Sequence, residues 1–313
     1  MRGCERDMES FLVAVNAVIP FFCYLALGYT MKIRGVVKEE FLQKLNQMVF
    51  KAFFPFMTFY NIYKADANSL PRPQLMIFAG VSILIVEGIL ILLVPRFIKE
   101  NPKRGVVIQA MFRSNFVLFG IPLTIQVFGD SASSIAAMMV TVVITIYNVT
   151  SVFILEMFNG EGFSNPLKTL RAVASNPLLQ GAVLGLIFFL LRIKVPSCLL
   201  TPIAAFSNMT SPLAIYVLGG TLQFSAIRKN LKYLVPALSC KLFVLPAIII
   251  AIAYAFGLRG LELFLLIAIY ATPVATASYP MAQNMGGDGE LAGQFVVIST
   301  AVSMFTLFLW IFF

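Results

Sequence analysis

Side chains that could perform catalysis or bind a metal are scarce in this sequence. The 313 residues include no His, so the chain can form neither a Ser/His/Asp triad nor a His-ligated metal site. The four cysteines show no CxxC spacing and three of them lie in apolar runs, which predicts free, packed thiols at Cys4, Cys23, Cys198 and Cys240. We therefore expect no enzyme activity, no metal site and no cofactor.

Four ionisable side chains stand inside long apolar runs: Lys51, Glu87, Arg113 and Lys241. A charge at the centre of a bilayer costs roughly 2.5 to 3.5 kcal/mol on insertion scales, so each should face a cavity or a partner. Three cations against one carboxylate leave an excess of two positive charges. A small organic anion would complement that excess, and we expect Arg113 and Lys51 to contact it.

Each of these charges also has an alternative explanation. The Arg113 guanidinium can snorkel toward the headgroups, Lys51 can bond carbonyls freed by Pro55, and Lys241 can be structural. Glu87 is a candidate carrier of a coupled proton, and an ion pair with Lys51 or Arg113 is the alternative.

The elements that would position these charges are membrane spans. Hydrophobic residues make up 59% of the chain and charged residues 12%, against roughly half and a quarter in soluble domains. Runs such as 76 to 94, 244 to 256 and 295 to 313 match or approach the ~20 residues that cross a bilayer. Lipid is therefore the expected solvent, and because the net charge of +9 maps to short loops, no nucleic-acid partner is expected.

Loop punctuation divides the apolar sequence into ten predicted helices. They lie near residues 10–31, 41–62, 74–95, 105–128, 132–157, 172–191, 197–222, 231–257, 260–285 and 290–312. The polar stretch 158–171 separates two sets of five, which gives a first unit at 1–157 and a second at 172–313. Residues 1 to 9 have no apolar core of their own, so we expect no cleavable signal peptide, and Met8 is a candidate start.

The distribution of positive charge predicts the orientation of these spans. Connections 1-2, 3-4, 5-6 and 7-8 hold thirteen Lys and Arg residues, and the opposite side holds seven. Cytoplasmic loops carry the excess of positive charge. We therefore expect the protein to lie in the cell membrane with both termini outside. The stretch 158–171 is then a joint on the cytoplasmic side.

The two sets of spans share positions of proline, glycine and aspartate when the chain is shifted by 157 or 158 residues. The shift superimposes Pro20 on Pro177, Gly28 on Gly185, Pro55 on Pro212, Pro122 on Pro280, Gly129 on Gly287 and Asp130 on Asp288. A repeat of five spans crosses the membrane an odd number of times, so its second copy is inverted. Inverted repeats characterise secondary transporters, whose sites lie near the midplane where interrupted helices meet.

The fourth and ninth spans carry the strongest interruptions, at Gly120-Ile121-Pro122 and at Pro273 with Ser278-Tyr279-Pro280. Proline removes a backbone donor and clashes with the preceding turn. The freed carbonyls at membrane depth must be satisfied, which confines such breaks to a protein-lined cavity. Ordinary kinks are the alternative. Asn148 and Asn208 are further candidates, either as cavity liners or as partners in helix-helix hydrogen bonds.

The string SNFVLFGIPL at residues 114–123 resembles the fourth-helix signature of the auxin efflux carrier family. This family is related in fold to bile acid:sodium symporters. The resemblance implies that the fourth and ninth helices unwind and cross to form an anion site between a scaffold and a moving domain. It assigns that site to Asn115, Gly120, Ile121 and Pro122, with Ser278, Tyr279 and Pro280 opposite. In its short joint the chain is similar to a prokaryotic branch of the family, whose members are described as malate or malonate permeases.

These observations together predict an all-helical permease that moves a small organic anion by alternating access. One alternative is a sodium-coupled symporter, with oxygen ligands from unwound carbonyls and side chains such as Asn115 or Gln126. Another is a channel or sensor derived from the same fold. The coupling ion, H+ or Na+, and assembly as a homodimer are left open.

Overall fold

The computed structural model of the protein describes residues 2–65, 71–129, 132–159, 171, 173–223 and 226–311, with side chains from residue 18 to residue 310. Over these residues the secondary structure is helical, apart from one isolated β-bridge between Ser114 and Val274. The predicted all-α class is confirmed for this part of the chain. Most of the joint at 158–171, and Asp130 of the repeat, lie outside the described residues.

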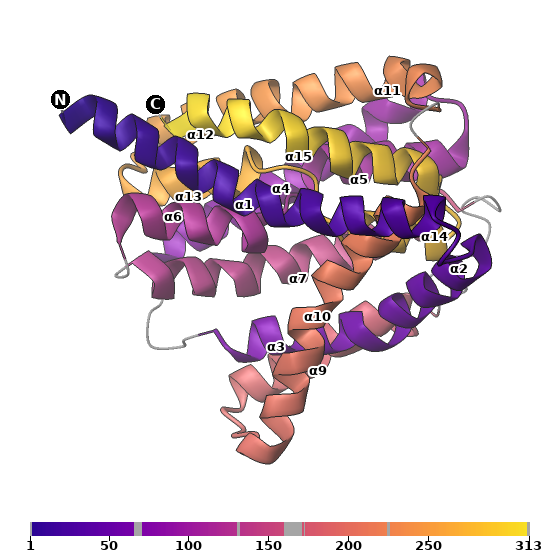
Figure 1. The fold of residues 1–313 in the computed structure, drawn as a ribbon. Coiled ribbons are helices and arrows are strands. Elements are labelled where there is room, and N and C mark those ends of the chain that lie inside the picture. Colours follow the sequence, from indigo (N-terminus) through magenta and orange to yellow (C-terminus); the bar gives the residue numbers. More distant parts are fainter. Residues whose placement is uncertain are drawn as a thin grey trace.

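The helices follow the apolar runs of the sequence (Figure 1). The first half contains α1 (Arg2–Ile33), α2 (Glu39–Met48), η1 (Val49–Phe53), α3 (Phe54–Tyr63), α4 (Pro73–Phe97), α5 (Asn101–Phe112), η2 (Phe116–Gly120), α6 (Ile121–Phe128) and α7 (Ser133–Met157). The second half contains α9 (Pro177–Leu190), α10 (Ser197–Thr221), α11 (Ile227–Ser239), η5 (Cys240–Val244), α12 (Leu245–Ala255), α13 (Leu261–Tyr270), α14 (Ser278–Asn284) and α15 (Gly289–Ile311). The two ends of the described chain lie at the same end of the molecule.

Among the described residues, five helices are long and apolar enough to cross a membrane. They are Pro73–Phe97, Ser133–Met157, Ser197–Thr221, Ile227–Ala255 and Gly289–Trp310. Shorter apolar helices occupy Val18–Ile33, Phe116–Phe128, Pro177–Leu190 and Leu261–Tyr270. Large hydrophobic side chains such as Ile77, Leu92 and Phe305 are exposed on the outer faces, as expected for helices that face lipid.

Three short π-helices each precede a proline. The π-helices η1, η2 and η5 lie directly before Pro55, Pro122 and Pro246. A proline cannot donate to the helical ladder, and its ring clashes with the carbonyl four residues earlier, so one wider turn relieves the conflict. Lys51 lies in η1 and Lys241 lies in η5. Each lysine therefore projects from a turn whose phase differs from that of a regular α-helix.

Two close helix pairs hold one side of the molecule together through glycines. A Cβ on Gly28 of α1 would lie 1.9 Å from the Tyr216 carbonyl oxygen of α10, and a Cβ on Gly181 of α9 would lie 2.4 Å from the Pro55 carbonyl oxygen of α3. Glycines at these contacts let the backbones touch, which is how membrane helices gain packing without a hydrophobic driving force. Helices α1, α3, α9 and α10 therefore form a tightly packed unit (Figure 1).

The remaining helices pack around α5, which α4, α7, α11 and α15 contact, and around α13, which α6 and α12 contact. The turn that starts α5 is fixed by Arg104, which donates to the Ile98 carbonyl and to Asn101 Oδ1. At the same turn, hydrogen bonds from the Tyr233 hydroxyl and the Lys103 ammonium lower the pKa of the Glu100 carboxyl. These contacts hold the first turn of α5 in place, and the helix ends at Phe112 in the middle of the molecule.

Candidate functional site at the paired helix breaks

The first break lies between α5 and η2. Helix α5 ends at Phe112 because Arg113 takes an extended conformation, with φ −81° and ψ 116°. Asn115 is also non-helical, with φ −86° and ψ 57°, and it precedes the first residue of η2. Pro122 lies inside the continuous helix Phe116–Phe128, and the π-helical turn η2 before it accommodates its missing N–H. The interruption predicted for this span is therefore present, and it begins several residues before the proline.

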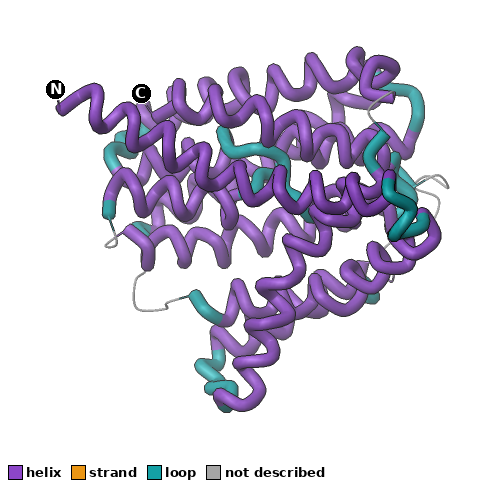
Figure 2. The backbone as a smooth tube through the Cα atoms, in the orientation of Figure 1, coloured by secondary structure: helices purple, strands orange, loops and turns teal. Residues whose placement is uncertain are grey.

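The second break is longer. Helix α13 ends at Tyr270 and helix α14 begins at Ser278, so residues 271–277 form no α-helix. Figure 2 shows such loop segments in the middle of the helical body as well as at its ends. The second half-helices finish alike, since Gly129 after α6 and Gly286 after α14 both have φ of +78°. The glycine that matches Gly129 in conformation is thus Gly286, where the repeat predicted Gly287.

The two breaks pair with each other through their backbones. The Asn115 amide donates to the Pro273 carbonyl at 2.8 Å, and the Ala275 amide donates to the Arg113 carbonyl at 3.3 Å. These bonds flank the antiparallel bridge between Ser114 and Val274. Buried backbone groups must be paired, and each unwound segment supplies hydrogen-bond partners for backbone groups of the other. The predicted meeting of the two breaks is therefore observed.

Two side-chain donors at this junction have no partner. Asn115 Nδ2 and Ser278 Oγ are both buried, and neither forms a hydrogen bond within the described residues. Asn115 precedes η2 and Ser278 starts α14, so both lie at helix N-termini, which carry positive potential. An unmade hydrogen bond costs about 1 to 3 kcal/mol. A buried ligand with acceptor oxygens would remove that cost.

The other crossover residues predicted by resemblance shape the junction. A Cβ on Gly120 would lie 3.2 Å from the Ala268 carbonyl oxygen, so glycine permits the close approach of η2 to α13. Ile121 is half-buried and Pro122 is exposed, whereas Tyr279 and Pro280 are buried. Thus Gly120, Ile121 and Pro122 set the course of the chain, and the polar side chains that could contact a ligand come from Asn115, Ser278 and Tyr279.

Two buried basic side chains adjoin the breaks, and neither pairs with a carboxylate of the part of the chain that the structure describes. The Arg113 guanidinium is 3% exposed and donates to Asn148 Oδ1 at 2.8 Å and to the Met281 sulfur. The Lys241 ammonium donates to Ser114 Oγ at 2.9 Å and to the Tyr270 carbonyl at 3.1 Å. Arg113 therefore does not snorkel to the surface. Asn148 is buried and bonds Arg113, which corresponds to the hydrogen-bonding alternative of the two roles predicted for it.

The remaining predicted site residues lie elsewhere. Lys51 and Asn208 are exposed on the outside of η1 and α10, so the structure does not bring them to the breaks. Glu87 is buried and accepts a hydrogen bond from Thr150 Oγ1 at 2.6 Å. The ion pair expected between Glu87 and Lys51 or Arg113 is absent from the described part of the chain.

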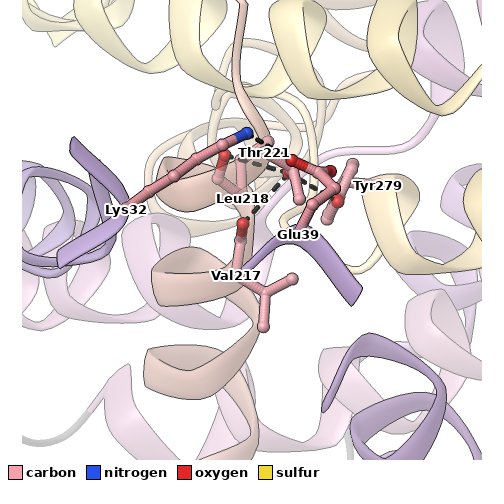
Figure 3. A network of polar contacts seen from close by, with 6 residues as sticks. All are labelled: Lys32, Glu39, Val217, Leu218, Thr221 and Tyr279. Atoms are coloured by element: carbon pink, nitrogen blue, oxygen red, sulfur yellow. Dashed lines mark hydrogen bonds and ion pairs between the residues drawn. The ribbon is translucent and has the colours of Figure 1, made fainter. Parts of the chain in front are cut away.

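Tyr279 links the second break to the opposite unit of helices (Figure 3). Its hydroxyl lies 2.7 Å from Thr221 Oγ1 at the end of α10. An ion pair between Lys32 of α1 and Glu39 of α2 lies beside this contact. Helix α14 is therefore tied to α10 close to the point where α1 ends and α2 begins.

Sequence reasoning missed the roles of Ser114 and Tyr147 and left Lys241 out of the site. Ser114 Oγ donates to the Ile269 carbonyl, lies 3.2 Å from the Tyr147 hydroxyl and accepts from Lys241. The sequence signal for Lys241 was its charge inside an apolar run. Its direction depends on the π-helical turn before Pro246, which no periodicity in the sequence revealed.

Comparison with known proteins identifies the group to which this architecture belongs. The sequence profile of the family described as "Membrane transport protein" matches residues 13–166 and 166–311, nearly the whole chain. The chain belongs to this family. It is the auxin efflux carrier family that the string at residues 114–123 resembled, so this is a multi-pass membrane protein with a role in transport.

Two relatives of this membrane transport protein are archaeal. An uncharacterized transporter of Methanothermobacter thermautotrophicus is 26% identical over 310 residues, which cover 96% of this chain and 98% of the relative. An uncharacterized transporter of Methanocaldococcus jannaschii is 24% identical over 312 residues, with the same coverage. Neither name states a substrate.

Proposed function

We propose that this transport protein is a secondary carrier that moves a small organic anion, such as a carboxylate, by alternating access. One observation carries the proposal: the unpartnered donors Asn115 Nδ2 and Ser278 Oγ lie at helix starts, next to the buried Arg113 guanidinium and the buried Lys241 amine, neither of which pairs with a carboxylate of the described residues. Donors, helix N-termini and uncompensated positive charge all favour a carboxylate. A cation or an amine would leave the donors unpaired.

The proposed architecture has ten spans in two inverted repeats, with the broken fourth and ninth spans crossing at the site. The glycine contacts support it, because Gly28 of α1 packs on α10 and its repeat partner Gly185 of α9 packs on α3. The first span (α1) thus packs on the seventh (α10) in the same way as the sixth span (α9) packs on the second (α3). In this proposal α1, α2, α3, α9 and α10 form the scaffold, and the helices around the breaks move against it.

We place the protein in the cell membrane with both termini outside and the stretch 158–171 in the cytoplasm. The excess of Lys and Arg in alternate connections supports this orientation. A homodimer would cover Lys51 and Asn208, which are polar and exposed at membrane depth.

A ligand screen on the purified protein tests the proposal. Thermal unfolding is followed with dicarboxylates, keto acids and aromatic acids, and with amines and neutral sugars as controls. Because a ligand that binds only the folded protein raises the unfolding temperature, at least one class of carboxylates should stabilise the protein and the amines should not. Stabilisation by amines or sugars alone would contradict the proposal.

A further inference from the structure

Lys241 is the one described basic side chain that hydrogen-bonds both to the first break and to the end of the helix that leads into the second break. Its ammonium donates to Ser114 Oγ, in the first break, and to the Tyr270 carbonyl, where α13 ends before the second break. Its exposed fraction is 1%. Pro246 forces the π-helical turn that aims the side chain in this direction. The position of this one amine therefore depends on both the first break and the end of α13.

The charge on this amine has no fixed partner. The ion pairs of the described residues lie at the periphery, at Lys32 with Glu39, Lys44 with Glu40, Arg72 with Glu262 and Lys103 with Glu100. A hydroxyl and a carbonyl at a helix C-terminus offset only part of the cost of burying an ammonium ion. A negative charge that arrives at the breaks would offset more of it.

The titratable groups around Lys241 do not supply that negative charge. Tyr147 shares Ser114 Oγ with the lysine, Tyr270 bonds Ser82, Arg113 adds a second cation, and Cys240 is the neighbour on η5. On the helices packed against η5, Tyr233 of α11 bonds Glu100, Tyr254 of α12 stacks with Arg259, and Glu290 of α15 bonds Gln294. None of these last three side chains faces Lys241.

Glu87 is the rival proton carrier, and its contacts differ. It bonds Thr150 on α7, and it has no hydrogen bond to either broken segment. A bound anion would repel a charged carboxylate, so a proton on Glu87 would also help binding. The position of Lys241 at the junction gives it the more direct interaction with the anion.

We propose that Lys241 carries one proton that is transported together with each anion, which makes this protein a proton:anion symporter. This inference rests on the proposed function. A proton from water on the side of entry binds the neutral amine, and the resulting ammonium faces the anion. On the other side the anion leaves and the ammonium returns its proton to water. The net movement is one anion and one proton, so transport of a monoanion carries no charge.

The sign of the pH dependence follows from this linkage. If the anion favours the protonated amine, binding must take up a proton, and affinity must fall as the pH rises. For one linked proton the limit is about tenfold per pH unit. Permanent charge at this position should remove the dependence, because no proton can then be gained or lost.

The experiment uses wild type and the variants Lys241→Arg, Lys241→Gln and Glu87→Gln in proteoliposomes that contain a pH-sensitive dye. The probes are labelled malonate, pyruvate and benzoate, at pH values where each acid is fully ionised, with sodium present or replaced by choline. Wild type should acidify the lumen during uptake in either salt. Lys241→Arg should bind the anion without acidification or pH dependence, Lys241→Gln should bind at least about tenfold more weakly, and Glu87→Gln should still move protons.

A measurement without mutation at Lys241 covers the case in which those variants do not fold. Calorimetric titration of the bound probe in two buffers with different ionisation enthalpies counts the protons taken up by wild type and by Glu87→Gln. About one proton per anion in both proteins supports the proposal. No uptake in wild type, loss of uptake in Glu87→Gln, or unchanged acidification by Lys241→Arg would overturn it. If no carboxylate binds wild type at all, the proposed function itself fails.

Discussion

At the scale of single residues, the junction combines groups that are costly to bury with no internal partner for them. Asn115 is the clearest case, because its backbone amide is bonded to Pro273 while its side-chain amide nitrogen is left unpaired. The backbone bond holds the residue in place. The side chain is then free to contact a ligand without disturbing the pairing of the breaks.

Replacement of Asn115 by Ala should therefore weaken carboxylate binding by roughly tenfold or more, which corresponds to the loss of one or two kcal/mol of hydrogen bonding. Asn115→Leu should be worse, because it also fills the polar space. Binding to the purified protein is measured by calorimetry. The matched control is Asn208→Ala, since Asn208 is exposed on α10. Unchanged affinity in a monodisperse Asn115→Ala protein would remove this residue from the site.

Replacement of Arg113 by Gln should also weaken anion binding, because it removes one of the two buried cations at the breaks. The glutamine amide can still donate to Asn148 Oδ1, which Arg113 bonds, so much of the packing is kept. The dissociation constant for the carboxylate that binds wild type is compared at low and high salt. A substrate that proves cationic, or an affinity that does not change, would show that this charge has no part in binding.

The family resemblance nominated Asn115 and Ser278, and its charge inside an apolar run nominated Arg113, but neither signal oriented every charge. Lys51 and Lys241 both lie in π-helices, and one extra residue in a turn rotates the rest of the helix by about 100°. Lys241 consequently faces the breaks and Lys51 faces outward. The contact of Glu87 with Thr150 depends on how α4 packs on α7, which the sequence does not encode locally.

At the scale of elements, the breaks follow from proline and the helix pairs follow from glycine. Proline positions predicted both interrupted spans, although helix α5 already ends at Phe112, ten residues before Pro122. The resemblance implied that the two breaks cross, but their pairing through a β-bridge was not predicted, because backbone bonds between residues as far apart as Ser114 and Val274 leave no local pattern. The tight packing of α1 on α10 was not predicted.

The glycine contacts should determine the stability of the packed unit. A Cβ on Gly219 would lie 2.0 Å from the Leu25 carbonyl oxygen, a backbone atom that cannot rotate away. Gly219→Ala should therefore lower the free energy of unfolding by about 1 to 3 kcal/mol, as overpacking does. Thermal unfolding in detergent measures the change. Gly88→Ala on α4 is the matched control, since nothing lies within 4 Å of its added Cβ. Equal unfolding temperatures for the two variants would contradict this account of the contact.

At the scale of the whole molecule, alternating access requires one unit of helices to move relative to the other. The structure ties them through Tyr279 and Thr221, next to the ion pair of Lys32 with Glu39 (Figure 3). Few polar contacts of this kind need to break for α14 to separate from α10. The fold class and the positions of most helices were predictable from hydropathy, whereas the relation between the two units depends on tertiary contacts that hydropathy does not report.

The orientation of the molecule gives a separate prediction. With both termini outside, an impermeant thiol reagent added to intact cells should label a single cysteine at residue 5 and should not label one at residue 165. The native cysteines are first removed, and permeabilised cells provide the control for reactivity. Labelling at residue 165 but not at residue 5 would reverse the assigned topology, while the proposed site would be unaffected.

We propose that the paired breaks bind an organic anion and carry it across the membrane. Counterflow in proteoliposomes tests this most directly: vesicles loaded with an unlabelled carboxylate that stabilises the protein are diluted into trace labelled carboxylate. A carrier should accumulate the label transiently above its equilibrium level, and Asn115→Ala should reduce the initial rate at the same trace concentration by roughly tenfold or more. Flux of the label without transient accumulation would identify a channel, and counterflow of amines or neutral solutes alone would contradict the anion site.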